Sequence, residues 1–169
     1  MIEREKHVAA IADSAGGKLV SRVRLQKIAY LLDQLGMESG FGYQYHHYGP
    51  YSRDLDNAIL DAEAFGYVEE TFERRQSDSA RYSVFKSKKV PETNVFGRLD
   101  ATKAKQVIRQ LADTNVTILE LAATAHWLAA MEKVPDWKKE IVRRKGPQTE
   151  NNRLDRALDL LRDLKLAPA

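Results

Sequence analysis

Residues 43–72 constrain the fold of this chain most strongly, because they join a forced backbone break, a capped helix and a strand. Gly49-Pro50 interrupts regular structure, since proline fixes φ and lacks an amide donor. Ser52 predicts a helix start, because its hydroxyl can accept a hydrogen bond from an unpaired amide of the first turn. Apolar side chains then recur at helical spacing up to Gly66, at Leu55, Ile59, Ala62 and Phe65.

A β-hairpin is expected directly after this helix. Val68 and Phe72 lie on one side of an extended segment at residues 67–72. The polar sequence RRQSDSA favours a turn and leads to a second extended segment at residues 81–85. A helix followed by such a hairpin is typical of the end of a winged-helix module, in which the hairpin is the wing.

Two further helices are expected before this unit. The first ends at Gly16-Gly17, and the second runs from a Ser21 cap to Gly36. Residues 37–51 are then expected to form an aromatic connection between the second helix and the one that Ser52 caps.

The C-terminal part is expected to be helical. A polar connector at residues 87–99 precedes a helix that begins at Asp100. Thr117 and Glu120 match a capping box for the next helix, and Pro135-Asp136 starts a short one that ends at Gly146-Pro147. An amphipathic helix over residues 154–164 is the last.

These patterns predict a mainly α chain of the α+β class. We expect a single domain over residues 1–169, with a winged-helix-like half at 1–88 that carries the small β-hairpin and a C-terminal helical bundle at 89–169. A winged-helix scaffold does not define a function, so function depends on the side chains it presents.

Composition excludes several function classes. The chain has no cysteine, which removes disulfides, thiol nucleophiles and thiolate metal sites. It has no apolar run of the roughly 20 residues that a membrane-spanning helix needs and no signal-peptide core, so a cytoplasmic protein without membrane contact is expected. Its 27 cationic and 24 anionic residues are nearly balanced, so total charge does not indicate nucleic-acid binding.

No motif for catalysis, cofactor binding or metal binding is present. His46 and His47 are adjacent, so on a strand they would point to opposite faces and chelate one ion poorly. The sequence lacks the HExxH, GxSxG, GxxxxGK[ST] and GxGxxG patterns. We therefore expect a chain that is not an enzyme, with no catalytic residue, no metal and no cofactor.

Charge is distributed unevenly around the predicted wing. The segment from Ser52 to Glu70 is acidic, and Arg53 is its only cation, so a recognition helix here would be repelled by DNA phosphates. Cations gather instead on or after the hairpin, at Arg74, Arg75, Arg81, Lys86, Lys88 and Lys89. A second group lies near the end of the short helix, at Lys138, Lys139, Arg143, Arg144 and Lys145. Both groups could contact phosphate or an acidic protein, or form a solvated surface.

The aromatic connection is the best candidate for a partner-binding surface. Tyrosines offer apolar area together with a polar tip, and four of them fall between residues 43 and 51. We expect Tyr43 and Tyr45 to point inward, and Tyr48 and Tyr51 to lie near the surface. The residues predicted to bind a partner are Tyr45, Tyr48, Gly49, Pro50, Tyr51 and Arg53.

The sequence resembles the bacterial and phage SocA-like antitoxin family, whose shared region is called the Panacea domain. VRLQKIAYLLDQLG at residues 23–36 and YHHYGPYSRDLDNAILDAEAFGYVEE at residues 45–70 carry the resemblance. ELAATAHWL at residues 120–128 and RRKGP at residues 143–147 extend it to the C-terminal helices. The positions that match the family pattern are Leu25, Gln26, Lys27, Tyr30, Gly49, Pro50, Leu55 and Gly66.

This resemblance implies a non-enzymatic protein that neutralises a partner by binding it. In the family the partner is often a toxin encoded beside the antitoxin, and one branch delivers the toxin to a protease. We therefore expect a protein partner, such as a cognate toxin and a protease or chaperone. The alternative is a winged-helix transcriptional regulator that places the basic wing on DNA. The oligomeric state is not indicated.

Overall fold

The structure, a computed structural model, describes residues 2–169 and has seven α-helices and five short strands within that range. The elements are α1 (Arg4–Ser14), β1 (Lys18–Val20), α2 (Arg22–Gln34), β2 (Gln44–His46), β3 (Gly49–Tyr51), α3 (Arg53–Ala64), β4 (Val68–Arg74), β5 (Arg81–Ser87), α4 (Ala101–Ala112), α5 (Val116–His126), α6 (Trp137–Lys145) and α7 (Arg153–Asp163). A π-helical turn at Trp127–Met131 extends α5, and a 3-10 turn at Gly146–Thr149 follows α6. The mainly helical α+β class is confirmed.

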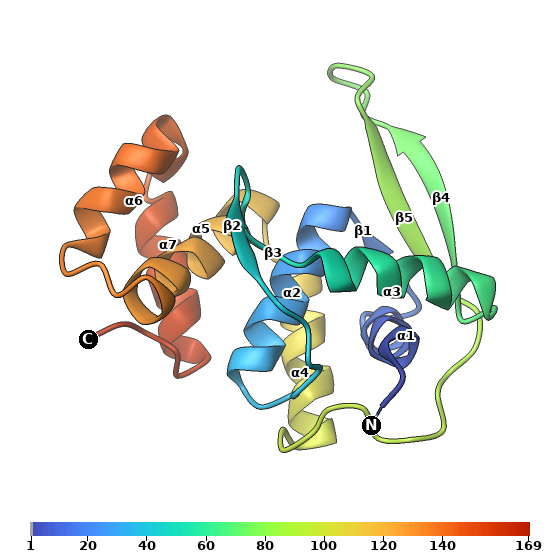
Figure 1. The fold of residues 1–169 in the computed structure, drawn as a ribbon. Helices are drawn as coiled ribbons and strands as arrows, with labels where there is room; N and C mark the ends of the chain where they lie inside the picture. Colours follow the sequence, from blue (N-terminus) through green and yellow to red (C-terminus); the bar gives the residue numbers. More distant parts are fainter. Residues whose placement is uncertain (1) are drawn as a thin grey trace.

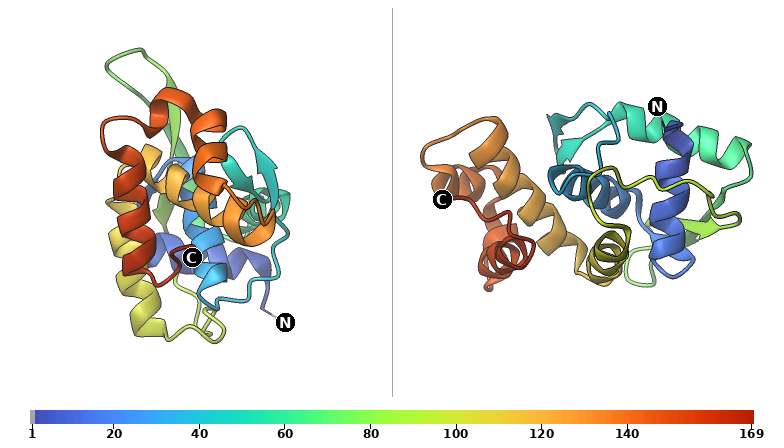
Figure 2. Two further views of the ribbon diagram at one scale, coloured as in Figure 1. Left: turned by 90° about the vertical axis from the view of Figure 1, so that its left-hand side faces the viewer. Right: turned by 90° about the horizontal axis from the view of Figure 1, so that it is seen from below.

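The helices form two neighbouring groups (Figures 1 and 2). In the first group α3 and α4 pack against α1, and α4 also packs against α2. In the second group α7 and α6 pack against α5, which reaches across to α2. The β2–β3 hairpin lies between the two groups, where β3 contacts both α2 and α5.

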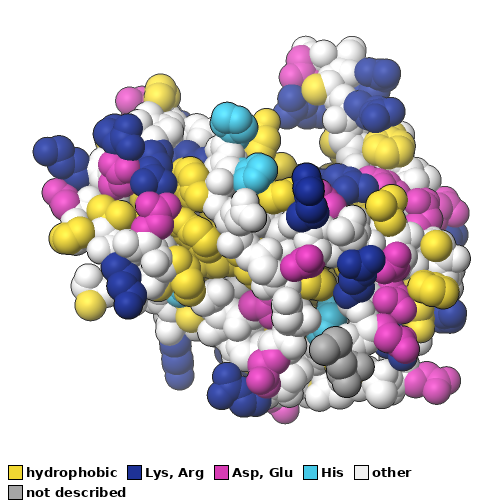
Figure 3. Space-filling model, in the orientation of Figure 1, with side chains coloured by type: hydrophobic (Ala, Val, Ile, Leu, Met, Phe, Trp, Pro, Cys, Tyr) yellow, Lys and Arg dark blue, Asp and Glu magenta, His cyan; other side chains and the backbone are white. Residues whose placement is uncertain are grey.

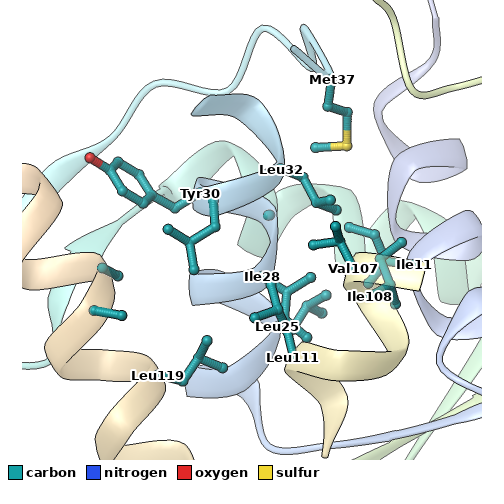
Figure 4. Close-up of a cluster of buried hydrophobic side chains, with 14 of the residues drawn as sticks. Ile11, Leu25, Ile28, Tyr30, Leu32, Met37, Val107, Ile108, Leu111 and Leu119 are labelled. Atoms are coloured by element: carbon teal, nitrogen blue, oxygen red, sulfur yellow. The ribbon is translucent and has the colours of Figure 1, made fainter. Parts of the chain in front are cut away.

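One apolar cluster joins the two halves of the chain. Leu25, Ile28 and Leu32 of α2 face the side chains of Val107 and Leu111 of α4 (Figure 4). The same cluster continues through α5 to the buried leucines of α7. Helix α5 has nine buried residues, as expected for a helix that is apolar nearly all round. Within residues 2–169, no helix has the length and apolar character needed to cross a membrane.

The predicted wing is present and longer than expected. Strands β4 and β5 pair antiparallel over seven residues each, with Phe72 opposite Ser83. A third strand, β1, adds to the other edge of β5 and places Leu19 opposite Phe85. Three residues between Gly17 and Ser21 show too little alternation to predict a strand, so β1 was not expected.

Most predicted helix starts are confirmed. The side chains of Ser21, Ser52 and Asp100 accept hydrogen bonds from the amides of Arg24, Leu55 and Lys103 at 3.2, 3.3 and 3.0 Å. Asp136 caps α6 in the same way, at 3.3 Å from the Lys139 amide.

The capping box expected at Thr117 and Glu120 is wrong. The cap of α5 is Asn115, whose side-chain oxygen accepts hydrogen bonds from Thr117 and Ile118. Asn115 therefore starts the helix two residues earlier. The Glu120 carboxylate instead binds a buried ammonium group, that of Lys145.

Candidate functional site

The β2–β3 hairpin is the ordered form of the aromatic connection, and α2 holds it in place. Gln26 of α2 donates to the carbonyl oxygen of Ser52 at 2.8 Å and accepts from the Ser52 amide at 2.8 Å. These two bonds have the same donor and acceptor pattern as those between neighbouring β-strands. The Gln26 side chain therefore takes the place of a strand that would pair with the Ser52 backbone. Gln26 is one of the residues that carry the family resemblance, and its geometric role here is to fix the exit of the hairpin.

Two buried lysines support the inner side of the hairpin. Lys27 of α2, 1% exposed, donates to the carbonyl oxygen of Pro50 at 2.7 Å. Lys145, at the end of α6, donates to the carbonyl oxygen of His47 at 2.9 Å and to the Glu120 carboxylate at 2.5 Å. Burial lowers the pKa of Lys27 to about 8, because desolvation penalises its charged form. Two buried ammonium groups therefore bind carbonyl oxygens of the hairpin backbone.

Two independent features of the structure require glycine at position 49. Its φ of +91° lies in the region that favours glycine. A Cβ atom built at this position would lie 2.5 Å from Oγ1 of Thr124 on α5, closer than real Cβ contacts. The hairpin therefore packs with its backbone directly on α5.

The tyrosines of the connection differ in exposure. Tyr48 at the tip is 57% exposed. Tyr45 is half-buried beneath the guanidinium of Arg144, whose Cζ lies 4.8 Å from the ring centre. Tyr51 is half-buried, with its ring 4.4 Å from that of His46, and its hydroxyl bonds to Asp56, which raises the pKa of the tyrosine. Tyr43 is half-buried and donates to Asp33 at 2.7 Å.

The residues predicted to bind a partner therefore differ in solvent exposure. Tyr48 and Arg53 are exposed, and Tyr45 and Tyr51 are half-buried. Gly49 and Pro50 are buried, so they shape the hairpin from within and are not accessible to another molecule in this conformation. Tyr48 lies at the surface as expected, whereas Tyr51 has the same half-buried class as Tyr43 and Tyr45, and its hydroxyl bonds to Asp56 of α3.

A cleft of about 620 Å³ separates the hairpin from the wing and is visible as a hollow in the surface (Figure 3). Its floor comes from the first turns of α2 and α5, where Val23, Arg24 and Val116 lie. Its walls come from Tyr48 on the hairpin and Arg81 on the wing. Tyr48 and Val23 also line a smaller adjoining hollow of about 320 Å³.

The basic residues of the wing are exposed but mostly engaged nearby. Arg75 pairs with Asp78 at 2.7 Å, and Arg81 stacks on Phe72 with its Cζ 4.2 Å from the ring centre. Lys89 lies 4.2 Å from the centre of the Tyr67 ring. Arg74 donates to the Ser79 carbonyl oxygen, and Lys88 lies 3.7 Å from Glu69. Lys86 lies opposite Glu69 in the strand register.

The acidic segment has more partners than its sequence indicated. Arg22 of α2 bridges Asp56 of α3 and Glu70 of β4, at 3.2 and 2.8 Å. Arg4 of α1 pairs with Asp61 at 2.6 Å. Both arginines precede the segment by at least 30 residues, so no local pattern could reveal the pairing.

Two residues of the second basic group, Arg144 and Lys145, make contacts within the molecule, whereas Lys138, Lys139 and Arg143 are exposed. Arg144 pairs with Glu132 and Glu140 at 3.0 and 2.7 Å while it covers Tyr45. Hydrogen bonds from Arg143 and Arg144 lower the pKa of Glu140 to about 2, and those from Arg144 and Trp127 lower the pKa of Glu132. Lys145 is buried, so it is unavailable to phosphate in this conformation. The sequence showed a cationic helix end but not that it anchors the hairpin.

The cleft does not assemble a recognisable catalytic set. Glu120 is the one carboxylate among residues 2–169 that lines it, and Lys145 already binds that carboxylate. Within the same range no group of three or more histidine and carboxylate side chains is placed to hold a metal ion. His126, away from the cleft, bonds the hydroxyl of Tyr30 at 2.7 Å through Nδ1.

Comparison with known proteins reveals two distant relatives. No protein-family model matches the chain. An uncharacterised protein of Bacillus subtilis, YwgA, is 25% identical over 166 residues, which cover 96% of each chain. A DNA ADP-ribosyl glycohydrolase of Thermus aquaticus is 27% identical over 126 residues, which cover 72% of this chain and 34% of that protein. One relative therefore aligns over almost its whole length and the other over about a third.

Proposed function

We propose that this chain is a non-enzymatic protein-binding module that neutralises a partner by direct binding, as an antitoxin does. One observation carries the proposal: Tyr48 is 57% exposed at the tip of a hairpin whose backbone is fixed by buried side chains. An exposed aromatic ring on a rigid support loses little conformational freedom on binding, which favours affinity.

The two relatives support a protein module that occurs in proteins of different lengths. The alignment of 166 residues covers 96% of the Bacillus protein, and the alignment of 126 residues covers 34% of the Thermus protein. A region that aligns with a whole short protein and with part of a longer one behaves as a transferable unit. About two thirds of the Thermus protein lies outside the aligned region.

The test begins with the tagged chain isolated from its own cells after nuclease treatment, followed by identification of stoichiometric partners. Affinity for the purified partner is then measured for Tyr48→Ala and for Phe65→Ala. Phe65 is a matched control, because it is 60% exposed at the other end of α3. We expect Tyr48→Ala to weaken binding by about 1–4 kcal/mol and Phe65→Ala to leave it unchanged. Equal affinities for both variants and the parent chain would refute the assignment of the hairpin.

A DNA-binding regulator is the second candidate, favoured by the exposed cations of the wing. It predicts binding to duplex DNA that falls by several decades between roughly 50 and 200 mM salt, because phosphate contacts release counterions. The local pairing of Arg75 and Arg81 and the acidic face of α3 disfavour it. A chain that purifies without a protein partner but retains DNA when nuclease is omitted would favour this candidate.

A further inference from the structure

The cleft between the hairpin and the wing carries an excess of positive charge. Arg24, Arg75 and Arg81 line it, and Glu120 is the only acidic side chain of the described residues that does so. Glu120 is 7% exposed and bonded to Lys145, which neutralises it. The unbalanced charges at the cleft are therefore cationic.

Arg24 is the most buried of these cations. Its Nη1 and Nη2 donate to the carbonyl oxygens of Val20 and Thr114 at 3.4 and 3.0 Å, and its buried Nε lacks a partner within residues 2–169. Carbonyl groups accept hydrogen bonds but do not neutralise a charge. Burial lowers the pKa of this guanidinium, which shows that its charged form is less favourable here than in water.

The start of α2 makes this charge still less favourable. Cations at a helix N-terminus oppose the helix dipole, and the first turn of α2 carries Arg22 and Arg24 without an acidic residue. Arg22 forms ion pairs with Asp56 and Glu70, whereas Arg24 forms none within residues 2–169, and its nearest compensating charge is the more distant Asp113. Ser21, which caps this helix and also lines the cleft, has a φ of +86°, a conformation that costs energy in a non-glycine residue. Strain and an unpaired charge therefore coincide on the cleft floor.

The remaining lining is mainly apolar. Val20, Val23 and Val116 contribute to it together with the rings of Tyr48 and Tyr82. A volume of about 620 Å³ accommodates several side chains of an extended or helical segment. A DNA duplex is too wide to enter a hollow of this volume.

We propose that this cleft binds an acidic segment of the partner protein, with a carboxylate on Arg24 and a second near Arg81, and with apolar side chains against Val23 and Tyr48. The inference rests on the proposed function and adds the chemistry of the bound segment. An incoming carboxylate would give Arg24 the ion pair that it lacks, in a half-buried site where the attraction is screened less than at the surface.

The experiment selects random dodecapeptides displayed on phage against the folded chain and measures the affinity of the selected peptides by fluorescence polarisation. We expect enrichment of aspartate and glutamate beside leucine or aromatic residues. Arg24→Gln should weaken binding at least about tenfold, because it leaves a carboxylate unpaired in the cleft. Arg24→Lys should restore part of the affinity, Arg81→Gln should weaken binding severalfold, and Arg162→Gln, an exposed control on α7, should leave it unchanged.

Circular dichroism of each variant separates lost binding from lost folding. If Arg24→Gln does not fold, Arg24→Lys and Arg81→Gln decide the outcome. Selected peptides without acidic enrichment, affinity unchanged in these variants, failure to select any peptide, or competition by a single-stranded oligonucleotide would each overturn the inference. A native partner whose binding depends on Tyr48 but not on Arg24 or Arg81 would remove the cleft assignment and leave the proposed function in place.

Discussion

The β2–β3 hairpin and the β4–β5 wing are both antiparallel hairpins, but they draw their order from different sources. The strands of the β2–β3 hairpin are three residues long and are held by Gln26, Lys27 and Lys145 from other elements. The strands of the wing are seven residues long; near the core β5 also pairs with β1, whereas their outer ends depend on their own ladder. At the tip of the wing, Arg75 pairs with Asp78, three residues away.

The difference shows where a rigid binding surface can be built. A two-stranded hairpin is marginally stable alone, so β2–β3 keeps its shape because buried groups of α2, α5 and α6 fix its backbone. The wing projects beyond the helices, and its distal residues are exposed (Figure 1). Changes in distant helices should therefore affect the hairpin, whereas changes at the wing tip should stay local.

Removal of the Lys27 anchor should have the largest effect. Lys27→Ala leaves the buried carbonyl oxygen of Pro50 without its donor and opens a cavity. We expect the free energy of unfolding in urea to fall by about 2–4 kcal/mol. Lys86→Ala, on the exposed face of the wing, is the control and should change it by less than about 0.5 kcal/mol. Equal losses in the two variants would contradict the distinction between the hairpin and the wing.

The protonation of Lys27 should make stability depend on pH. The pKa of Lys27 is about 8 in the folded chain and 10.5 in the unfolded chain. At a pH between these two values the unfolded chain therefore binds more protons than the folded chain. The free energy of unfolding should therefore rise between about pH 8 and 10, by roughly 1–3 kcal/mol relative to Lys27→Met. Subtracting the variant removes the contributions of tyrosines such as Tyr30, whose pKa burial raises. A difference that stays flat over this range would show that Lys27 is not desolvated.

Gly49→Ala should reveal the close approach of the hairpin to α5. This change combines a strained φ with a clash against Thr124, whereas Gly16→Ala, at φ +101° with open space around it, has the strain alone. We expect a loss of about 1–3 kcal/mol for Gly49→Ala and of about 1 kcal/mol for Gly16→Ala in thermal unfolding. Thr124→Ala in the Gly49→Ala background should recover part of the difference. No recovery would mean that the contact with Thr124 is not the cause.

The ion pair at the wing tip should have the smallest effect. Arg75 and Asp78 are both exposed, so their attraction is screened by water. Arg75→Ala should change the free energy of unfolding by less than about 0.5 kcal/mol, as measured by urea denaturation. A loss as large as that of Lys27→Ala would show that the wing is coupled to the core.

Local patterns predicted the parts of the fold that local forces determine. Ser52 and the apolar spacing after it identified α3, and the polar turn between residues 72 and 81 identified the wing. The β2–β3 hairpin was expected only as an aromatic connection. Its strands are too short to alternate, and Gly49-Pro50 resembles a break in the chain.

The candidate site was predicted in part. The tyrosine-rich segment pointed to the hairpin, and the leucine-glutamine-lysine pattern included Gln26 and Lys27, which anchor it. Arg24 was not singled out in the sequence, and Lys145 and Glu120 were assigned other roles, in a cationic helix end and in a capping box. Their importance comes from burial and from contacts between residues far apart in the chain, which no local pattern encodes.

The most direct measurement is amide hydrogen exchange of the free chain and of its complex with the purified partner. Amides of the β2–β3 hairpin, including that of Ser52, should already be protected in the free chain, whereas those at residues 75–80 of the wing should exchange quickly. In the complex, added protection should appear around Tyr48 and the first turn of α2. Fast exchange of the hairpin in the free chain, or new protection confined to α6 and α7, would contradict a preorganised binding surface beside the cleft.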